Sequence, residues 1–228
     1  MLNAGRAFKA AARMIGFSLI ILVALVAVGY FAYQIGAALR LITGYLVVLW
    51  IAFALFTLYF FRDPDPIAPT DPQAIVAPGH GKVDLVDETE VEEVMGGKCR
   101  RISIFLSVFD VHVQNAPVHG KVTYLQHKPG LYLNAMRSDC AAHNENVLIG
   151  FEPVGRPGTR VGVRLIAGLI ARRIVPWIGP EQLVPRSERI SLIQFGSRVD
   201  LYLPMDTRVE VKPGDRVVGG QTIVARFL

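Results

Sequence analysis

Cysteine is scarce in this 228-residue chain, which holds only Cys99 and Cys140. The two are far apart in sequence, so they lack the paired spacing that structural zinc sites use, and we expect no metal site. Long basic runs are missing too, because Arg100-Arg101 and Arg172-Arg173 are only short pairs. The net charge of +5 is therefore typical of a solvated surface, and no nucleic-acid partner is expected.

Charge is nearly absent from the N-terminal part, where Arg40 is the only charged residue between Arg13 and Arg62. Two apolar runs result, over residues 14–39 and 41–61. Each meets the roughly 20-residue length needed to span a bilayer. The first is longer than the apolar core of a cleaved signal peptide, and a second follows at once. We predict a retained membrane anchor over residues 1–61, with transmembrane helices at about 14–38 and 41–61 joined near 34–41.

The positive charges around this hairpin predict its orientation. Arg6, Lys9 and Arg13 precede the first run, whereas only Arg40 lies in the turn. Positive residues favour the cytoplasmic side, so both the N-terminus and the chain after Arg62 are expected there, at the inner membrane. A reducing compartment makes a disulfide unexpected. A basic chain at a membrane is also attracted to anionic lipid surfaces.

Residues 62–74 form a proline-rich linker, with four prolines between positions 60 and 72. Proline cannot continue a helix, so this segment is expected to be a stiff, extended connector that keeps the following domain close to the bilayer. That closeness favours a substrate that resides in the membrane.

The remaining residues, 75–228, predict one globular α+β domain that is mostly β. Alternating or apolar runs indicate strands near 75–86, 101–108, 119–125 and 160–168, and helical spacing indicates a short helix over 131–144. Glycine turns separate short β runs over 209–225, which resembles the barrel-sandwich folds of biotinyl and lipoyl domains. No lysine stands at a hairpin tip there to carry biotin or lipoate, so the likeness concerns the fold alone.

A glycine interrupts the strand pattern of residues 190–204 at Gly196, and Ser197 follows it. Glycine inside a strand marks a bend, a bulge or a close backbone approach. The pair fits an inert β-bulge. On local sequence alone this inert interpretation is favoured, but the pair also fits a reactive corner, since the Ser197 hydroxyl lies beside the carbonyl of Gly196.

Four segments occur in an order that favours the reactive interpretation: residues 60–64, 109–117, 166–174 and 195–200. Together they closely resemble the short, membrane-anchored bacterial phosphatidylserine decarboxylases, over about residues 56–228. The combination is specific, although each segment alone is a weak signal.

The resemblance implies that the proenzyme cleaves itself between Gly196 and Ser197. Residues 1–196 would form the β chain and residues 197–228 the α chain, which stay together as a heterodimer. The α chain would begin with a pyruvoyl group made from Ser197, the family's covalent cofactor. This group binds the serine amine of the lipid and accepts the electrons left when CO2 departs. The implied reaction converts phosphatidylserine, a membrane phospholipid, into phosphatidylethanolamine.

His112 matches the family histidine in the Asp-Val-His-Val segment, and its ordinary pKa suits a proton donor at neutral pH. His80 stands where the family usually has aspartate in a Pro-x-Asp-Gly turn, and Asn115 where longer relatives have a second histidine. Two interpretations stay open. His80 activates Ser197, with Asn115 or Asp110 orienting it, or the substitution leaves a processing-deficient homologue.

Arg172 and Arg173 could neutralise a lipid phosphate through bidentate guanidinium contacts, or pair with acidic side chains as structural partners. The competing function is a non-catalytic, membrane-tethered barrel-sandwich binding module, which has no use for a cleavable Gly196–Ser197 corner. A third hypothesis keeps the chemistry and changes the lipid tails to ether-linked ones. A homo-oligomer is compatible with all three.

Overall fold

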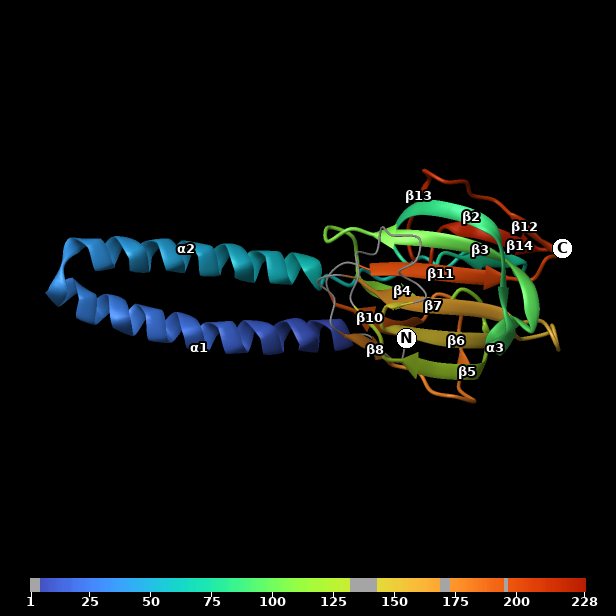
Figure 1. The fold of residues 1–228 in the computed structure, drawn as a ribbon, viewed down its shortest axis with the longest axis horizontal. Helices are drawn as coiled ribbons and strands as arrows, with labels where there is room; N and C mark the ends of the chain where they lie inside the picture. The colour runs from blue at the N-terminus through green and yellow to red at the C-terminus, as the bar shows by residue number, and fades with distance from the viewer. Residues whose placement is uncertain (1–4, 132–142, 169–172, 195–196) are drawn as a thin grey trace. The chain divides into compact units, whose positions relative to one another are not determined.

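The computed structural model describes residues 5–131, 143–168, 173–194 and 197–228. Contacts divide the chain into a helical unit, Gly5–Asp63, and a β unit that contains Pro64–Leu228. The fold class predicted from the sequence is confirmed, since a mostly β unit follows two apolar helices (Figure 1). The helix predicted over 131–144 falls largely on 132–142 and lies outside the described residues.

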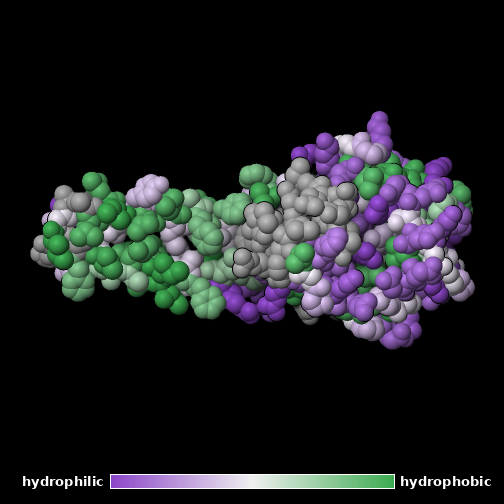
Figure 2. Space-filling model, viewed as in Figure 1, coloured by the Kyte–Doolittle hydropathy of each residue, from purple (hydrophilic) through white to green (hydrophobic). Residues whose placement is uncertain are grey.

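The helical unit contains α1 (Arg6–Ile35) and α2 (Ala37–Phe60), which contact each other as a hairpin. Both are long and apolar enough to cross a membrane, over Ala7–Phe31 and Leu39–Phe60, and their exposed surface is strongly hydrophobic (Figure 2). The helix α1 begins earlier than the predicted residue 14, because lysine and arginine are good helix formers and do not end a helix.

A single glycine, Gly36, separates α1 from α2, so the turn is tighter than the predicted 34–41 segment. Arg40 lies in the first turn of α2, not in the connection itself. Its guanidinium donates to the carbonyl of Tyr33 at 3.0 Å and covers the Tyr33 ring, 4.7 Å from the centroid. Arg40 therefore satisfies a carbonyl in the last turn of α1 that has no partner within its own helix.

Within the described part of the β unit, the largest sheet has eight strands, and all of its pairings are antiparallel. In spatial order they are β13 (Arg216–Val217), β2 (Gly81–Val91), β3 (Gly97–Leu106), β11 (Ser197–Leu203), β7 (Val161–Ala167), β6 (Asn146–Pro153), β5 (Gly120–Lys128) and β9 (Leu183–Val184). A one-turn helix, α3 (Glu92–Met95), joins β2 to β3 and was not predicted.

Two three-stranded sheets accompany the large one in the described residues. The first has β14 (Ile223–Phe227) between β1 (Ala74–Val76) and β12 (Thr207–Val209), and the second has β10 (Arg189–Ile193) between β4 (Val113–Asn115) and β8 (Ile174–Pro176). Ile75, Ile190 and Val224 belong to the same buried cluster as Val199 and Leu201 of β11. The small sheets therefore enclose the core together with the curled large sheet (Figure 1).

The central strand β11 is buried along its whole length. Val199, Leu201 and Leu203 belong to the main core, and the alternation of a strand places Ser197 on the same face. On the opposite face Arg198 bonds Asp200 at 3.1 Å and Asp84 at 2.7 Å. Burial raises the pKa of Asp84, although the Arg198 charge opposes that shift. Arg198 thus links the strand that begins with Ser197 to Asp84 of β2.

Candidate active site

Ser197 is the first residue of β11, paired with Leu106 at the end of β3 and with Ala167 at the end of β7. It is 0 % exposed, and its Oγ has no hydrogen-bond partner among the described residues. Leaving a buried hydroxyl unpaired costs about 1–3 kcal/mol, so such a group calls for an explanation. The hydroxyl of Ser103 in β3 shares this property, which means that burial alone does not identify a nucleophile. Gly196 lies outside the described residues.

The turn that carries His80 lies against the beginning of β11. A Cβ built on Gly79 would stand 3.5 Å from Val199 Cγ2 and 3.7 Å from Leu106 Cδ1. Leu106 is the register partner of Ser197, and Val199 follows Ser197 by two residues on the same face. The amide of Asn115 donates to the carbonyl of Pro78 at 2.9 Å and holds the turn there. Turn and serine therefore share one end of the sheet.

His80 and Asn115 meet at Gly219. A Cβ on Gly219 would stand 3.0 Å from His80 Nε2 and 2.9 Å from Asn115 Oδ1, so both atoms border the same small space. The Asn115 side chain is buried, and its Nδ2 donates to the carbonyl of Ser187 at 2.9 Å. This bond fixes which end of the carboxamide faces the imidazole. The structure thus brings together the two residues that depart from the fuller Asp/His pattern.

Asp110 organises the turn after β3. Its Oδ2 accepts from the Ser107 amide at 2.8 Å and from the Ser107 hydroxyl at 2.7 Å, and Arg216 Nη1 lies 3.7 Å from Oδ1. The carbonyl of Asp110 accepts a hydrogen bond from His112 Nδ1 at 2.9 Å. The interactions described for Asp110 thus link it to His112, while those of Asn115 link it to the His80 turn.

His112 is 1 % exposed and is fixed by its own backbone neighbours. Because Nδ1 donates to a carbonyl, the neutral ring has its lone pair on Nε2, which is the atom able to take up a proton. The carbonyl of His112 accepts from Ile193 N at 3.1 Å and from Gln114 Nε2 at 2.7 Å. Ser191 Oγ in turn donates to Gln114 Oε1 at 2.7 Å. Sequence reasoning missed Gln114 and Ser191, because neither residue type is distinctive in a strand.

Arg173 is exposed, and its carbonyl accepts from the amide of Gln194 at 3.2 Å. It is therefore joined to the chain three residues before Ser197. Arg172 lies outside the described residues, so the predicted pair is described only in part. Within the described ranges, no group of three or more His, Cys, Asp or Glu residues is arranged to hold a metal ion.

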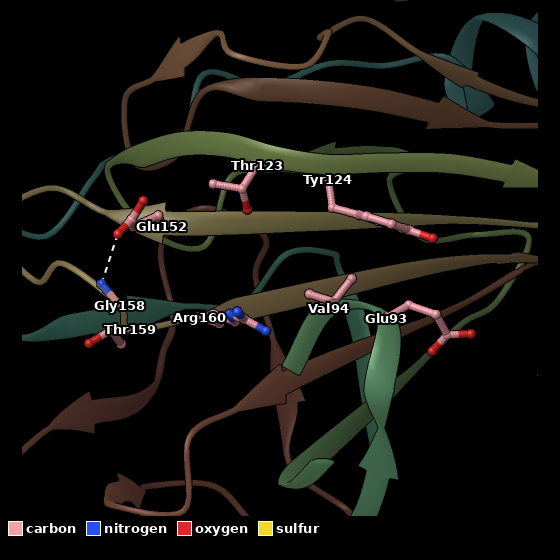
Figure 3. Close-up of a pocket in the computed structure, with 8 residues that line it drawn as sticks. All are labelled: Glu93, Val94, Thr123, Tyr124, Glu152, Gly158, Thr159 and Arg160. Atoms are coloured by element: carbon pink, nitrogen blue, oxygen red, sulfur yellow. Dashed lines mark hydrogen bonds between the residues drawn. The ribbon is translucent and has the colours of Figure 1, made fainter. Parts of the chain in front are cut away.

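A cavity of about 300 Å³ lies at the other end of the large sheet (Figure 3). It is lined by Glu93, Val94, Thr123, Tyr124, Glu152, Gly158, Thr159 and Arg160. Arg160 precedes β7, whose far end, Ala167, pairs with Ser197. At about 3.3 Å per residue, the length of β7 separates this cavity from Ser197 by roughly 20 Å. We therefore assign this cavity no part in the chemistry at Ser197.

The mostly β unit thus has a buried serine, Ser197, at the start of its central strand, near the turn that carries His80. The chain belongs to the phosphatidylserine decarboxylase family, whose model matches residues 53–225. It is 42% identical over 183 residues to the phosphatidylserine decarboxylase proenzyme of Desulfotalea psychrophila, covering 80% of this chain and 85% of that protein.

Two further relatives carry the same name, phosphatidylserine decarboxylase proenzyme. The protein of Symbiobacterium thermophilum is 44% identical over 174 residues, covering 76% of this chain and 80% of the relative. The protein of Erythrobacter litoralis is 43% identical over 208 residues, covering 83% and 82%. The family predicted from the four sequence segments is therefore confirmed.

Proposed function

We propose that this chain is a membrane-anchored proenzyme that cleaves itself between Gly196 and Ser197 and then converts phosphatidylserine into phosphatidylethanolamine. Family membership supports the decarboxylation, and the name that the relatives carry, proenzyme, supports the cleavage. The observation that carries the assignment to Ser197 is its buried Oγ, which has no partner among the described residues and lies near the turn that carries His80.

The proposed cleavage balances with one water molecule. Ser197 Oγ attacks the carbonyl carbon of Gly196, the C–N bond breaks, and the amide becomes an ester. Loss of the Ser197 Cα proton then breaks the Cβ–Oγ bond and releases residues 1–196 with a new carboxylate. The dehydroalanine left at residue 197 takes up a proton on Cβ and becomes an imine, which water hydrolyses with loss of ammonia. Residues 197–228 then begin with a pyruvoyl group.

His80 is the residue we assign to take the proton from Ser197 Oγ, with Asn115 orienting its ring. Support comes from the His80 turn lying against Leu106 and Val199, and from Asn115 Oδ1 bordering the same space as His80 Nε2. An imidazole has a pKa near neutrality, so it accepts a proton more readily than a carboxylate does at that pH. The aspartate-to-histidine change is therefore compatible with maturation.

The residues around Ser197 suit a pyruvoyl group. The serine hydroxyl is consumed in forming that group, and here it has no hydrogen bond to lose among the described residues. When present, the group supplies a carbonyl that accepts the electron pair left behind when CO2 departs. The apolar neighbours Leu106, Ala167 and Val199 exclude water from this position.

His112 is the residue we assign to hold the proton that replaces CO2 on the headgroup carbon. Its Nδ1–H is fixed on the Asp110 carbonyl, so Nε2 is the atom that carries and releases this proton. Arg173, exposed near the segment that precedes Ser197, is our candidate for the lipid phosphate, together with Arg172. The two apolar helices fit an anchor in the inner membrane, with the β unit on the cytoplasmic side.

Intact mass spectrometry of the full chain in detergent tests the proposal. The wild type should give a fragment lighter by one ammonia than Ser197–Leu228, and Ser197→Ala should give none. Ser103→Ala is the matched control, because it removes a second hydroxyl, in β3, that is buried and has no partner among the described residues, and it should mature normally. An uncleaved wild-type chain would refute the proposal and favour the processing-deficient homologue or the tethered binding module.

A further inference from the structure

The linker predicted as a simple connector is bound along the β unit. Arg186 Nη1 donates to the carbonyls of Asp71 at 2.6 Å and Ala74 at 2.8 Å, and its Nη2 donates to the carbonyl of Pro69. Proline-rich chain has few amides for regular pairing, so its carbonyls need donors from elsewhere. One guanidinium supplies them over a stretch of six residues.

A second arginine binds the beginning of the linker. Arg189 Nη2 lies 2.7 Å from Asp65 Oδ1, and the Arg189 side chain is only 2 % exposed whereas that of Asp65 is 77 % exposed. A guanidinium buried to this degree needs compensating partners, and the linker carboxylate is one of them. The next residue, Pro66, packs closely against Gly220, since a Cβ there would stand 2.8 Å from Pro66 Cβ.

Ser187, which lies between the two arginines in sequence, contacts Asn115 of the proposed processing site. Its carbonyl accepts from Asn115 Nδ2 at 2.9 Å, and its hydroxyl donates to the Gly220 carbonyl at 2.6 Å. Ser187 has a φ of 68°, a left-handed conformation that is uncommon for serine and persists only where surrounding contacts hold it. Asn115 Cγ lies 3.2 Å from the Cβ position of Gly220, on which Pro66 also packs.

We infer that Arg186, Ser187 and Arg189, which we call the linker clamp, couple docking of the linker to self-cleavage. The outer two residues hold the linker, and the middle one holds the carboxamide that borders His80. Asp65 then acts as a positioning residue for the maturation of the chain. With the linker undocked, Arg189 loses a charged partner, and the clamp no longer fixes Asn115 against the His80 turn. This inference rests on the proposed function of Ser197 and His80.

The test follows cleavage of newly synthesised full-length chain in detergent micelles over time. Asp65→Asn removes the charge that Arg189 binds, and should slow cleavage about tenfold, because small displacements of a reacting geometry have large effects on rate. Asp65→Glu restores the charge and should recover most of the rate. Asp206→Asn is the matched control: its exposed carboxylate lies in the turn after β11, outside the linker and the clamp, so the wild-type rate is expected.

Thermal unfolding of each variant, made in an uncleavable Ser197→Ala background, checks that each is folded at the assay temperature; Asp65→Asn should have a lower midpoint than Asp206→Asn, because it removes a charged partner of buried Arg189. The inference is overturned if Asp65→Asn cleaves as fast as Asp206→Asn, if Asp65→Glu is as slow as Asp65→Asn, or if Asp65→Asn is already unfolded at the temperature of the cleavage assay. A wild-type chain that stays uncleaved overturns the proposed function instead.

Discussion

Gly219→Ala tests the assignment of His80 and Asn115 most directly. The new methyl group would stand 2.8 Å from His80 Cδ2, 3.0 Å from His80 Nε2 and 2.9 Å from Asn115 Oδ1. Ordinary carbon contacts lie at 3.4–4 Å, so either the imidazole or the carboxamide must move. The φ of Gly219 is outside the left-handed region, so alanine adds no backbone strain of its own.

The displacement sets the size of the effect. Restoring ordinary contacts requires a shift of about 0.5–1 Å, and misplacing a reacting group by 1 Å can cost on the order of a hundredfold in rate. We therefore expect cleavage at Gly196–Ser197 to slow about tenfold to a hundredfold. Overpacking also lowers the free energy of unfolding, by about 1–3 kcal/mol, which leaves a folded protein if the parent stability is ordinary.

The assay measures the fraction of full-length chain that remains uncleaved after synthesis, in wild type, Gly219→Ala and Gly179→Ala. Gly179 is the matched control, because a Cβ there meets nothing within 4 Å and its φ is not positive. Thermal unfolding of the uncleavable Ser197→Ala forms checks that both variants fold. Cleavage of folded Gly219→Ala at the rate of Gly179→Ala would refute the role of His80 and Asn115 in maturation.

Further outcomes follow from the same structure. His112→Gln should leave cleavage intact but lower CO2 release from phosphatidylserine vesicles by about 10²–10⁴-fold, the usual worth of a positioned proton donor, and loss of cleavage instead would reassign His112 to maturation. In a Cys140→Ala chain, Cys99 should resist a maleimide at neutral pH until the protein is unfolded, because it is buried and burial raises the pKa of its thiol; prompt labelling of native protein would contradict this. Burial also raises the pKa of Asp84 above its ordinary 3.8, so folded protein binds that proton more tightly. The contribution of Asp84 to stability should be present below pH 3.8 and lost as the pH rises through its folded pKa. The thermal midpoints of uncleavable wild-type and Asp84→Asn chains should therefore converge or cross as the pH rises. A difference in midpoint that does not change with pH would exclude the raised pKa.

Much of the fold could be predicted because its signals are local. Absence of charge predicted the two apolar helices, and alternation predicted the strands around Ile75, Arg101, His119 and Arg160. The structure of residues 190–204 could be predicted only in part. Its two halves form β10 and β11, which lie in different sheets, and alternation indicates a strand without saying which partner it pairs with.

The site was predictable only as far as its residues lie in recognisable segments. Ser197, His80 and His112 could be named from their neighbours in sequence. That Asn115 and His80 both border Gly219 could not, because the three residues lie far apart in sequence, in β4 and in two separate turns. The clamp was missed for a related reason. Proline content predicts that a linker is extended, but only folding brings the linker carbonyls within hydrogen-bond distance of Arg186.

The position of β11 has a consequence for the order of events in the life of the protein. After the proposed cleavage, residues 197–228 would still supply β11 between β3 and β7, and β14 between β1 and β12. β11 is bonded on both sides to strands of residues 1–196, and β14 is bonded to one such strand, β1, so the cleaved piece cannot diffuse away without disrupting two sheets. These strand pairings form during folding of the uncleaved chain, in which Ser197 is still covalently joined to the residues before it. A cleaved molecule that is denatured would have to refold from two separate chains. Folding is therefore a step that the protein completes before maturation and performs once.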